Sequence, residues 1–290
     1  LVGMCFVPET PRWLLSKGRL KECRKVLQKI EPENTVNDLI GQMEVEIEKD
    51  RNSAVGWRYL MQPWLRTPLM IAVCIMFFQQ FVGINTVIYY SPKIFLMAGF
   101  ESTLSAIWAS VGIGIVNVVF TVISLYLVDR IGRRKLYFIG LSGIAFSVLC
   151  LSACFIYANQ LGEIGRWLMV IFMFGYVAFF AISIGPLGWL VISEIFPQKV
   201  RGLGTSIGSL AVWIFNCIVS FTFFKIIDFF SIPGTEIVVG QTTSENPAGA
   251  FFLYGFIAVL GLVWGYLFLP ETKGLSLEEI EQKWRKNREC

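Results

Sequence analysis

The densest group of polar residues within an apolar stretch lies between positions 79 and 90. Gln79, Gln80 and Asn85 supply three side-chain amides, and Tyr89 and Tyr90 add two hydroxyl groups. A primary amide donates and accepts hydrogen bonds without carrying a charge. This chemistry suits a neutral, polyhydroxylated ligand, and the alternative use of such amides is to hydrogen-bond one helix to another.

The spacing of two of these amides predicts a broken helix. Gln80 and Asn85 would point about 140° apart on a straight helix, because successive residues turn by roughly 100°. Gly83 lies between them and permits a break. Irregular backbone at membrane depth is tolerated where it lines a cavity. We therefore expect a break near Gly83 that directs both amides into one cavity.

Other apolar stretches carry single polar or aromatic residues. Asn117 is one of them. Pro186 lies between glycines and lacks a helical N–H donor, which predicts a bend beside Trp189. Trp213 and Asn216 share a helix face three residues apart. A Trp ring can stack on the apolar face of a sugar while its N–H donates to a hydroxyl, and packing within a bundle is the alternative role.

Charged residues with ordered spacing follow two of the stretches. Asp129 precedes Arg133 and Arg134, and Glu194 precedes Arg201. An acid at a helix end and an arginine in the next loop can form ion pairs between helices. Such pairs would hold one side of a transporter closed, whereas the alternative is that these charges only set the orientation in the membrane.

The elements that position these residues are apolar and long. Of the 290 residues, 55% are hydrophobic. Six windows contain no charged residue, namely 67–92, 102–128, 136–162, 167–193, 202–224 and 246–270. A hydrocarbon core of about 30 Å requires roughly 20 apolar residues per helix. The sequence therefore predicts an all-α integral membrane protein with six membrane-spanning helices.

The distribution of Lys and Arg predicts the orientation. All but three of the 25 lie in 8–66, 129–135, 194–201 and 271–290. By the positive-inside rule these segments face the cytoplasm. We expect the protein to reside in a plasma membrane or a bacterial inner membrane, with its helices in contact with the lipid bilayer.

Four segments follow from these patterns. They are 1–7 as the end of a preceding transmembrane helix, 8–66 as a cytoplasmic helical insert, 67–270 as a six-helix transmembrane unit, and 271–290 as a cytoplasmic helix. In the insert, Thr10 before Pro11 predicts one helix start and Thr35 with Asp38 a second. Because the chain starts within a helix, we expect it to be the C-terminal part of a longer protein or a processed product. The tripeptide Pro-Glu-Thr occurs at 8–10 and 270–272, as a duplicated six-helix unit would leave it.

Several kinds of chemistry are excluded. The chain has no histidine, which excludes His-dependent catalysis and His-ligated metal. No phosphate-binding loop is present, and the basic residues in 17–29 alternate with acids, so we expect no nucleic-acid binding. We expect no enzyme activity, no cofactor and no metal.

Together these motifs resemble the sugar porter family of the major facilitator superfamily over essentially the whole chain. The resemblance rests on the residues 8–12, 79–90, 129–134, 185–201 and 270–274. It implies a twelve-helix fold of two six-helix halves with a helical insert between them. This chain corresponds to the insert and the C-terminal half.

The resemblance also implies roles for individual residues. Sugar ligands fall on Gln79, Gln80, Asn85, Asn117 and Trp189, with Phe180 and Trp213 nearby. An outer gate falls on Tyr89 and Tyr90, and a cytoplasmic charge network on Asp129, Arg133, Arg134, Glu194 and Arg201. Some hexose facilitators have Glu where this chain has Ala181, and many members have an amide where it has Val212. A pentose, a hexose, inositol and another polyol therefore remain open.

The resemblance implies that the chain transports a sugar or polyol by alternating access, with an N-terminal six-helix half as its partner. Proton symport through that half and facilitated diffusion both fit the residues of this chain. The alternatives are a non-transporting sugar receptor on the same fold and a truncated half that needs a partner.

Overall fold

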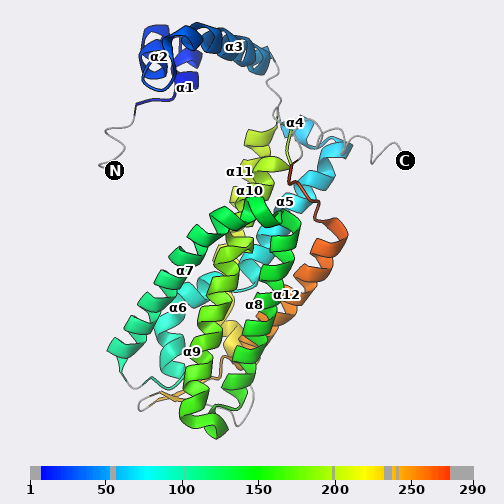
Figure 1. Ribbon diagram of the computed structural model, residues 1–290. Helices are drawn as coiled ribbons and strands as arrows, with labels where there is room; N and C mark the ends of the chain where they lie inside the picture. The colour runs from blue at the N-terminus through cyan, green and yellow to red at the C-terminus, as the bar shows by residue number, and fades with distance from the viewer. Residues whose placement is uncertain are drawn as a thin grey trace. The chain divides into compact units, whose positions relative to one another are not determined.

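The computed structural model of the protein describes residues 8–52, 57–100, 102–197, 200–231, 237–239 and 242–274. The chain forms two compact units, Leu1–Tyr59 and Leu60–Cys290, called here the insert and the membrane unit (Figure 1). The predicted all-α transmembrane fold is confirmed, with six segments long and apolar enough to span a membrane. The predicted helix end at 1–7 and most of the C-terminal helix at 271–290 lie outside the described residues.

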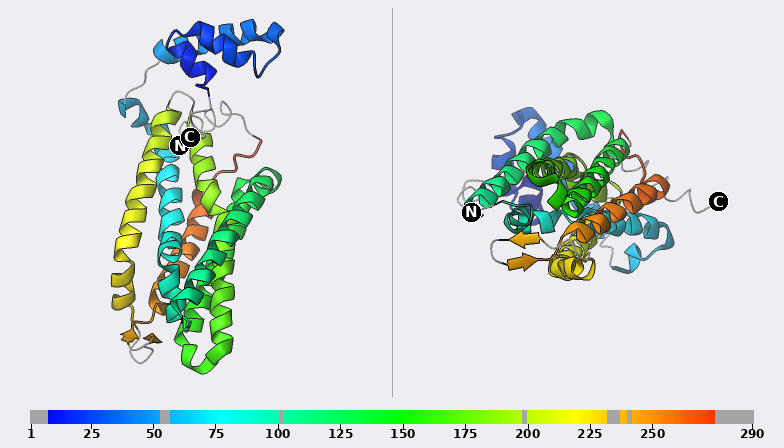
Figure 2. Two further views of the ribbon diagram at one scale, coloured as in Figure 1. Left: turned by 90° about the vertical axis from the view of Figure 1, so that its left-hand side faces the viewer. Right: turned by 90° about the horizontal axis from the view of Figure 1, so that it is seen from below.

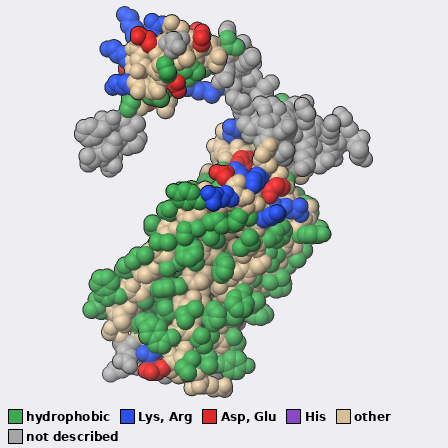
Figure 3. Space-filling view, viewed as in Figure 1, with side chains coloured by type: hydrophobic (Ala, Val, Ile, Leu, Met, Phe, Trp, Pro, Cys, Tyr) green, Lys and Arg blue, Asp and Glu red, His purple; other side chains and the backbone are tan. Residues whose placement is uncertain are grey.

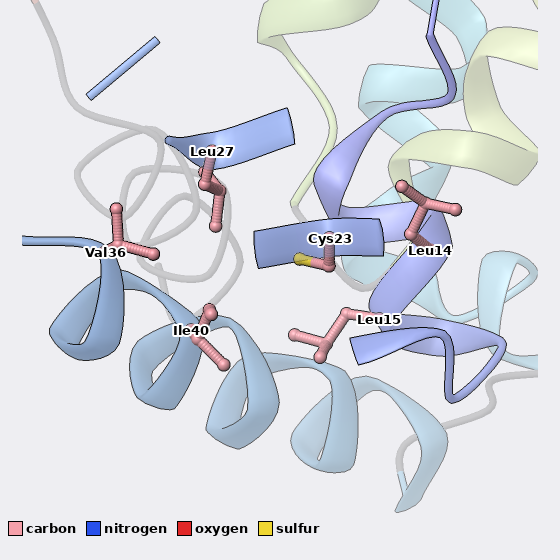
Figure 4. Packing of buried hydrophobic residues seen from close by; sticks show 6 residues of the cluster. All are labelled: Leu14, Leu15, Cys23, Leu27, Val36 and Ile40. Atoms are coloured by element: carbon pink, nitrogen blue, oxygen red, sulfur yellow. The ribbon is translucent and has the colours of Figure 1, made fainter. Parts of the chain in front are cut away.

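In residues 8–52 of the insert, the structure describes the helices α1 (Pro11–Ser16), α2 (Leu20–Leu27) and α3 (Glu33–Asn52). Their apolar faces meet in one cluster (Figure 4), which contains Leu14, Leu15, Cys23, Leu27, Val36 and Ile40. Apolar residues on α2 recur every three to four positions, so one face of that helix is buried while its charged residues stay exposed.

The predicted helix starts of the insert have different outcomes. Pro11 is the first residue of α1, but the Thr10 side chain accepts no capping hydrogen bond. The prediction of a second start at Thr35 is wrong, because α3 already begins at Glu33. Pro32 precedes that start, and the Thr35 hydroxyl donates to the Pro32 carbonyl at 2.8 Å within the first turn. Thr35 is therefore a residue of the helix and not its cap.

The membrane unit is an elongated bundle (Figures 1 and 2). In the sequence, α4 (Trp57–Leu60) crosses the boundary between the two units. The membrane unit continues with a 3-10 turn (Pro63–Leu65) and the helices α5 (Arg66–Phe81), α6 (Ile84–Met97), α7 (Thr103–Ile131), α8 (Arg133–Ile156), α9 (Ala158–Ile182), α10 (Ile184–Glu194), α11 (Arg201–Phe229) and α12 (Ala248–Phe268). The sequence did not predict the short antiparallel ribbon of β1 (Ile237–Val239) and β2 (Thr242–Ser244).

Two of the six spanning segments are broken, as the glycine and proline positions predicted. The first breaks between α5 and α6, where Gly83 has a φ of 87° that favours glycine. The second breaks at Ser183, between α9 and α10. Pro186 cannot donate to the Ile182 carbonyl four residues earlier. The Ser124 hydroxyl of α7 donates to that carbonyl instead, at 2.8 Å.

The packing of the insert can be tested through Cys23. Its side chain is fully buried, and burial, together with the Glu44 carboxylate, raises the pKa of its thiol. Because the thiolate is the reactive form, we expect slow labelling by a water-soluble maleimide when Cys23 is the only cysteine. Leu27→Ala should speed labelling at least tenfold, since such core truncations cost about 2–5 kcal/mol.

Lys25→Ala is the matched control, because Lys25 lies on the exposed side of the same helix. We expect its labelling rate to equal that of the parent. Equal rates for the Leu27 and Lys25 variants would show that the cluster does not protect the thiol.

Candidate functional site

A cavity of about 320 Å³ lies between α5, α6, α7, α9 and α10, beside both helix breaks. It is lined by Gln79, Gln80, Ile84, Asn85, Asn117, Thr121, Phe180, Ala181, Gly185, Pro186 and Trp189. Three of the six spanning segments contribute to this lining. None of the described residues that line it is charged, so the cavity suits a neutral ligand.

The amides of α5 and α6 form a hydrogen-bonded chain along one wall. The Gln79 amide donates to the carbonyls of Ile184 (3.1 Å) and Gly185 (2.7 Å), which joins α5 to the start of α10. Gln80 donates to the Gln79 side-chain oxygen at 3.3 Å, and Asn85 donates to the Gln80 oxygen at 2.6 Å. The expectation that a break brings Gln80 and Asn85 together is confirmed.

Two buried tyrosines and a threonine hold this break. Tyr176 donates to the Val82 carbonyl at 2.8 Å, and the Thr86 hydroxyl donates to the Gly83 carbonyl at 2.7 Å. The Tyr254 ring lies against the Cα of Gly83, where a Cβ would overlap it. Sequence reasoning missed Tyr176 and Tyr254, because a tyrosine within an apolar window carries no signal that separates this role from packing.

The remaining lining of the cavity combines polar and aromatic side chains. Asn117 and Thr121 are one turn apart on α7, and the Thr121 hydroxyl donates to the Asn117 carbonyl at 2.7 Å. Phe180 of α9 and Trp189 of α10 border the cavity, and Trp189 is 44% exposed. Thr121 was missed, although its spacing of four residues from Asn117 places both on one helix face. Amides and aromatic rings in one cavity suit a ligand with hydroxyl groups and apolar faces.

Three residues predicted as sugar ligand or outer gate do not line this cavity. Trp213 is on α11, 64% exposed, and is not among the residues that line the cavity. Tyr89 accepts a long hydrogen bond from the Asn216 amide of α11 at 3.4 Å. The Tyr90 ring stacks on Phe223 of α11. Their roles as ligand and gate stay predictions.

Charged side chains gather at one end of the membrane unit, whereas the sides seen in Figure 3 are mostly hydrophobic. Arg133 forms ion pairs with Glu194 at 3.0 Å and with Asp129 at 3.1 Å. Glu194 also accepts a hydrogen bond from the Thr272 hydroxyl at 2.6 Å. The Glu194 side chain is 22% exposed and that of Asp129 is 75% exposed, so the Glu194 pair is the more protected from water.

Glu271 caps the first turn of α8. Its two carboxylate oxygens accept the backbone N–H groups of Arg133 (3.0 Å) and Arg134 (3.2 Å). A negative charge at a helix N-terminus is favourable.

The side chain of Arg134 donates to the Tyr266 carbonyl at 2.8 Å. In the part of the chain that the structure describes, the Nε and Nη2 groups of Arg201 are buried without a hydrogen-bond partner.

Six spanning segments, with two breaks around a neutral cavity and a charge cluster at one end, define an α-helical membrane protein of the major facilitator type. The solved structure of the proton:xylose symporter XylE of Escherichia coli, bound to 6-bromo-6-deoxy-D-glucose, aligns with a TM-score of 0.72 at 33% identity. The alignment covers 98% of this chain and 56% of that one. The family model described as "Sugar (and other) transporter" matches residues 1–284, and the chain belongs to that family.

Curated relatives agree with this assignment. The chain is 36% identical to the glucose transporter GlcP of Staphylococcus epidermidis, over 98% of this chain and 59% of the relative. It is 34% identical to the D-xylose-proton symporter of Escherichia coli K12, over 98% of this chain and 54% of the relative. The chain thus spans about half the length of the curated relatives it matches.

The break at Gly83 can be tested by Gly83→Ala. A side chain there meets both a positive φ and the Tyr254 ring. We expect the free energy of unfolding to fall by about 2–4 kcal/mol, because left-handed strain and overpacking each cost about 1–3 kcal/mol. Thermal unfolding of the purified protein in detergent measures this. Gly114→Ala is the control, since nothing lies within 4 Å of its added Cβ, and equal melting temperatures for both variants would contradict the packing described.

A double-mutant cycle tests the charge cluster. Arg133→Gln and Glu194→Gln should each destabilise the protein, and the double variant should lose less than the sum, with a coupling of about 1 kcal/mol or more. Asp129→Asn should change stability by less than about 0.5 kcal/mol, because exposed pairs contribute little. The measurement is again thermal unfolding. Additive effects of Arg133→Gln and Glu194→Gln would show that their ion pair contributes nothing.

Proposed function

We propose that this chain forms the C-terminal half of a transporter for a monosaccharide, inositol or a similar polyol that works by alternating access. The observation that carries the proposal is the Gln80–Asn85 hydrogen bond across a helix break, in an uncharged cavity that is also lined by the aromatic residues Phe180 and Trp189. Neutral donors and acceptors recognise hydroxyl groups without favouring an ion. Phe180 and Trp189 supply surfaces for the apolar faces of a sugar ring.

The polar ligands of this proposal are Gln80, Asn85 and Asn117. The amide of Gln79 already donates to two backbone carbonyls, and its side chain is only 2% exposed. Gln79 would therefore keep α10 in place and orient Gln80, whose amide donates to its oxygen, and its role as a direct ligand stays a prediction. Trp213 would reach a substrate only through the surface that faces the partner half.

The partner is an N-terminal six-helix half. The length of the relatives supports this partner, because the chain covers 54% to 59% of the two named above. The two halves would rock about a substrate held between them. The charge cluster would then close the cytoplasmic side, and breaking the Arg133–Glu194 pair would accompany its opening. The excess of Lys and Arg on that side supports this orientation.

Proton symport and facilitated diffusion are both forms of this proposal. The Escherichia coli relative is named as a D-xylose-proton symporter and the Staphylococcus relative as a glucose transporter. No acidic side chain is among the described residues that line the cavity. In a symporter the proton would therefore bind to the partner half.

Gln80→Ala in the complete protein tests the function. We expect uptake to weaken at least tenfold, equivalent to about 1.4 kcal/mol, because the variant loses its contact with substrate and frees Asn85. Uptake of labelled hexoses, pentoses and inositol is measured with and without a pH gradient. Gln160→Ala, at an exposed glutamine of α9, is the control.

Unchanged half-saturation and maximal rate in Gln80→Ala would contradict the assignment of the cavity. Binding of a sugar without uptake by the parent protein would indicate a receptor on the same fold.

A further inference from the structure

Two aromatic residues of α11 hold the outer part of α6. The group consists of Tyr90 and Lys93 on α6 and Phe223 and Phe224 on α11, and it is called here the α6–α11 clamp. It lies at the end of the membrane unit opposite the Arg133–Glu194 pair, because α6 and α11 both end there. The Tyr90 ring is parallel to Phe223, with centroids 5.4 Å apart, and meets Phe224 edge-on at 4.8 Å.

Lys93 completes the clamp through its charge. Its Nζ lies 4.1 Å from the centroid of the Phe224 ring. A lysine ammonium within about 6 Å of a ring centroid is attracted by the negative face of the ring. Among the described residues, no carboxylate forms an ion pair with Lys93, so this ring is the partner that holds its ammonium group.

The hydrogen bonds across the same interface are long. Tyr90 donates to the Ser220 carbonyl and Asn216 donates to the Tyr89 hydroxyl, both at 3.4 Å. Hydrogen bonds weaken beyond about 3.2 Å. The ring contacts and the cation–π contact of the clamp are therefore stronger interactions between α6 and α11 than these two hydrogen bonds.

The clamp is connected to the cavity through α6 itself. Asn85, whose amide donates to Gln80, lies in the first turn of α6, and Lys93 lies about 12 Å further along the helix at 1.5 Å per residue. Gly83 permits a change of angle at the start of the helix. A shift of the outer end of α6 away from α11 would therefore move Asn85 relative to Gln80.

We propose that the contact of Lys93 with Phe224 sets how often α6 occupies the position next to α11. Lys93 is a positioning residue, because it acts on the cavity through α6 and Asn85 and touches no substrate. An effect of this contact on the cavity as a substrate site rests on the proposed function, whereas its effect on the position of α6 does not. Loss of the contact raises the fraction of molecules in which the outer end of α6 has moved away from α11.

The test measures the distance between spin labels on Leu96 of α6 and Phe229 of α11, in the complete protein without native cysteines and without sugar. We expect Lys93→Gln and Phe224→Leu each to raise the population at longer distance roughly two- to fivefold, which is the range of an exposed cation–π contact. The double variant should resemble either single variant, because both remove one contact.

Conservative and matched variants separate this contact from a general loss of structure or charge. Lys93→Arg and Phe224→Trp should keep the parent distribution, since a guanidinium and an indole preserve the contact. Lys225→Gln removes the same charge from the residue next to Phe224 and should also leave the distribution unchanged. Unchanged distances in Lys93→Gln, or an equal shift in Lys225→Gln, would overturn the proposal.

This experiment is independent of transport. A shift in Lys93→Gln while no sugar is taken up by the parent protein would overturn the proposed function alone. Normal uptake by the parent with no shift in Lys93→Gln would overturn the clamp alone.

Discussion

A backbone carbonyl within a bilayer must find its hydrogen-bond donor inside the protein, and this requirement governs the two broken helices. Pro186 leaves the Ile182 carbonyl without a helical donor, and Ser124 supplies one. Tyr176 does the same for Val82 at the other break, and Gln79 donates to Ile184 and Gly185. The Ile182 and Val82 carbonyls at the breaks therefore accept from side chains of other helices, and Gln79 joins α5 to the start of α10 in addition.

The same hydrogen bonds orient the proposed binding groups. With its amide held by α10, Gln79 offers its oxygen to Gln80, and Gln80 in turn accepts from Asn85. The cavity thus acquires polar, uncharged walls without placing an ion at membrane depth, where a charge would be costly. The charged residues of this cluster lie at helix ends, where Glu194 pairs with the Arg133 guanidinium and Glu271 accepts from the backbone at the start of α8.

Much of this could be predicted from residue order alone. Charge-free windows predicted the six spanning segments, and Gly83 and Pro186 predicted the breaks, because a positive φ and a missing N–H are properties of single residues. Predictions that depend on which residues lie nearby in the folded protein were less accurate. The start of α3 was misplaced at Thr35. Tyr176 and Tyr254 were overlooked because their hydrogen-bond partners, Val82 and Thr86, are 94 and 168 residues away in the sequence, where no local pattern indicates them.

The sequence by itself determined the fold class, the number of spanning segments, the broken helices and the uncharged character of the site, because hydropathy, charge and backbone freedom are carried by the residues themselves. Only the tertiary structure decided that Gln79 holds α10, that Glu271 caps α8 and that Lys93 lies on Phe224. These contacts join helices far apart in the chain, and which side chains meet depends on how the helices pack.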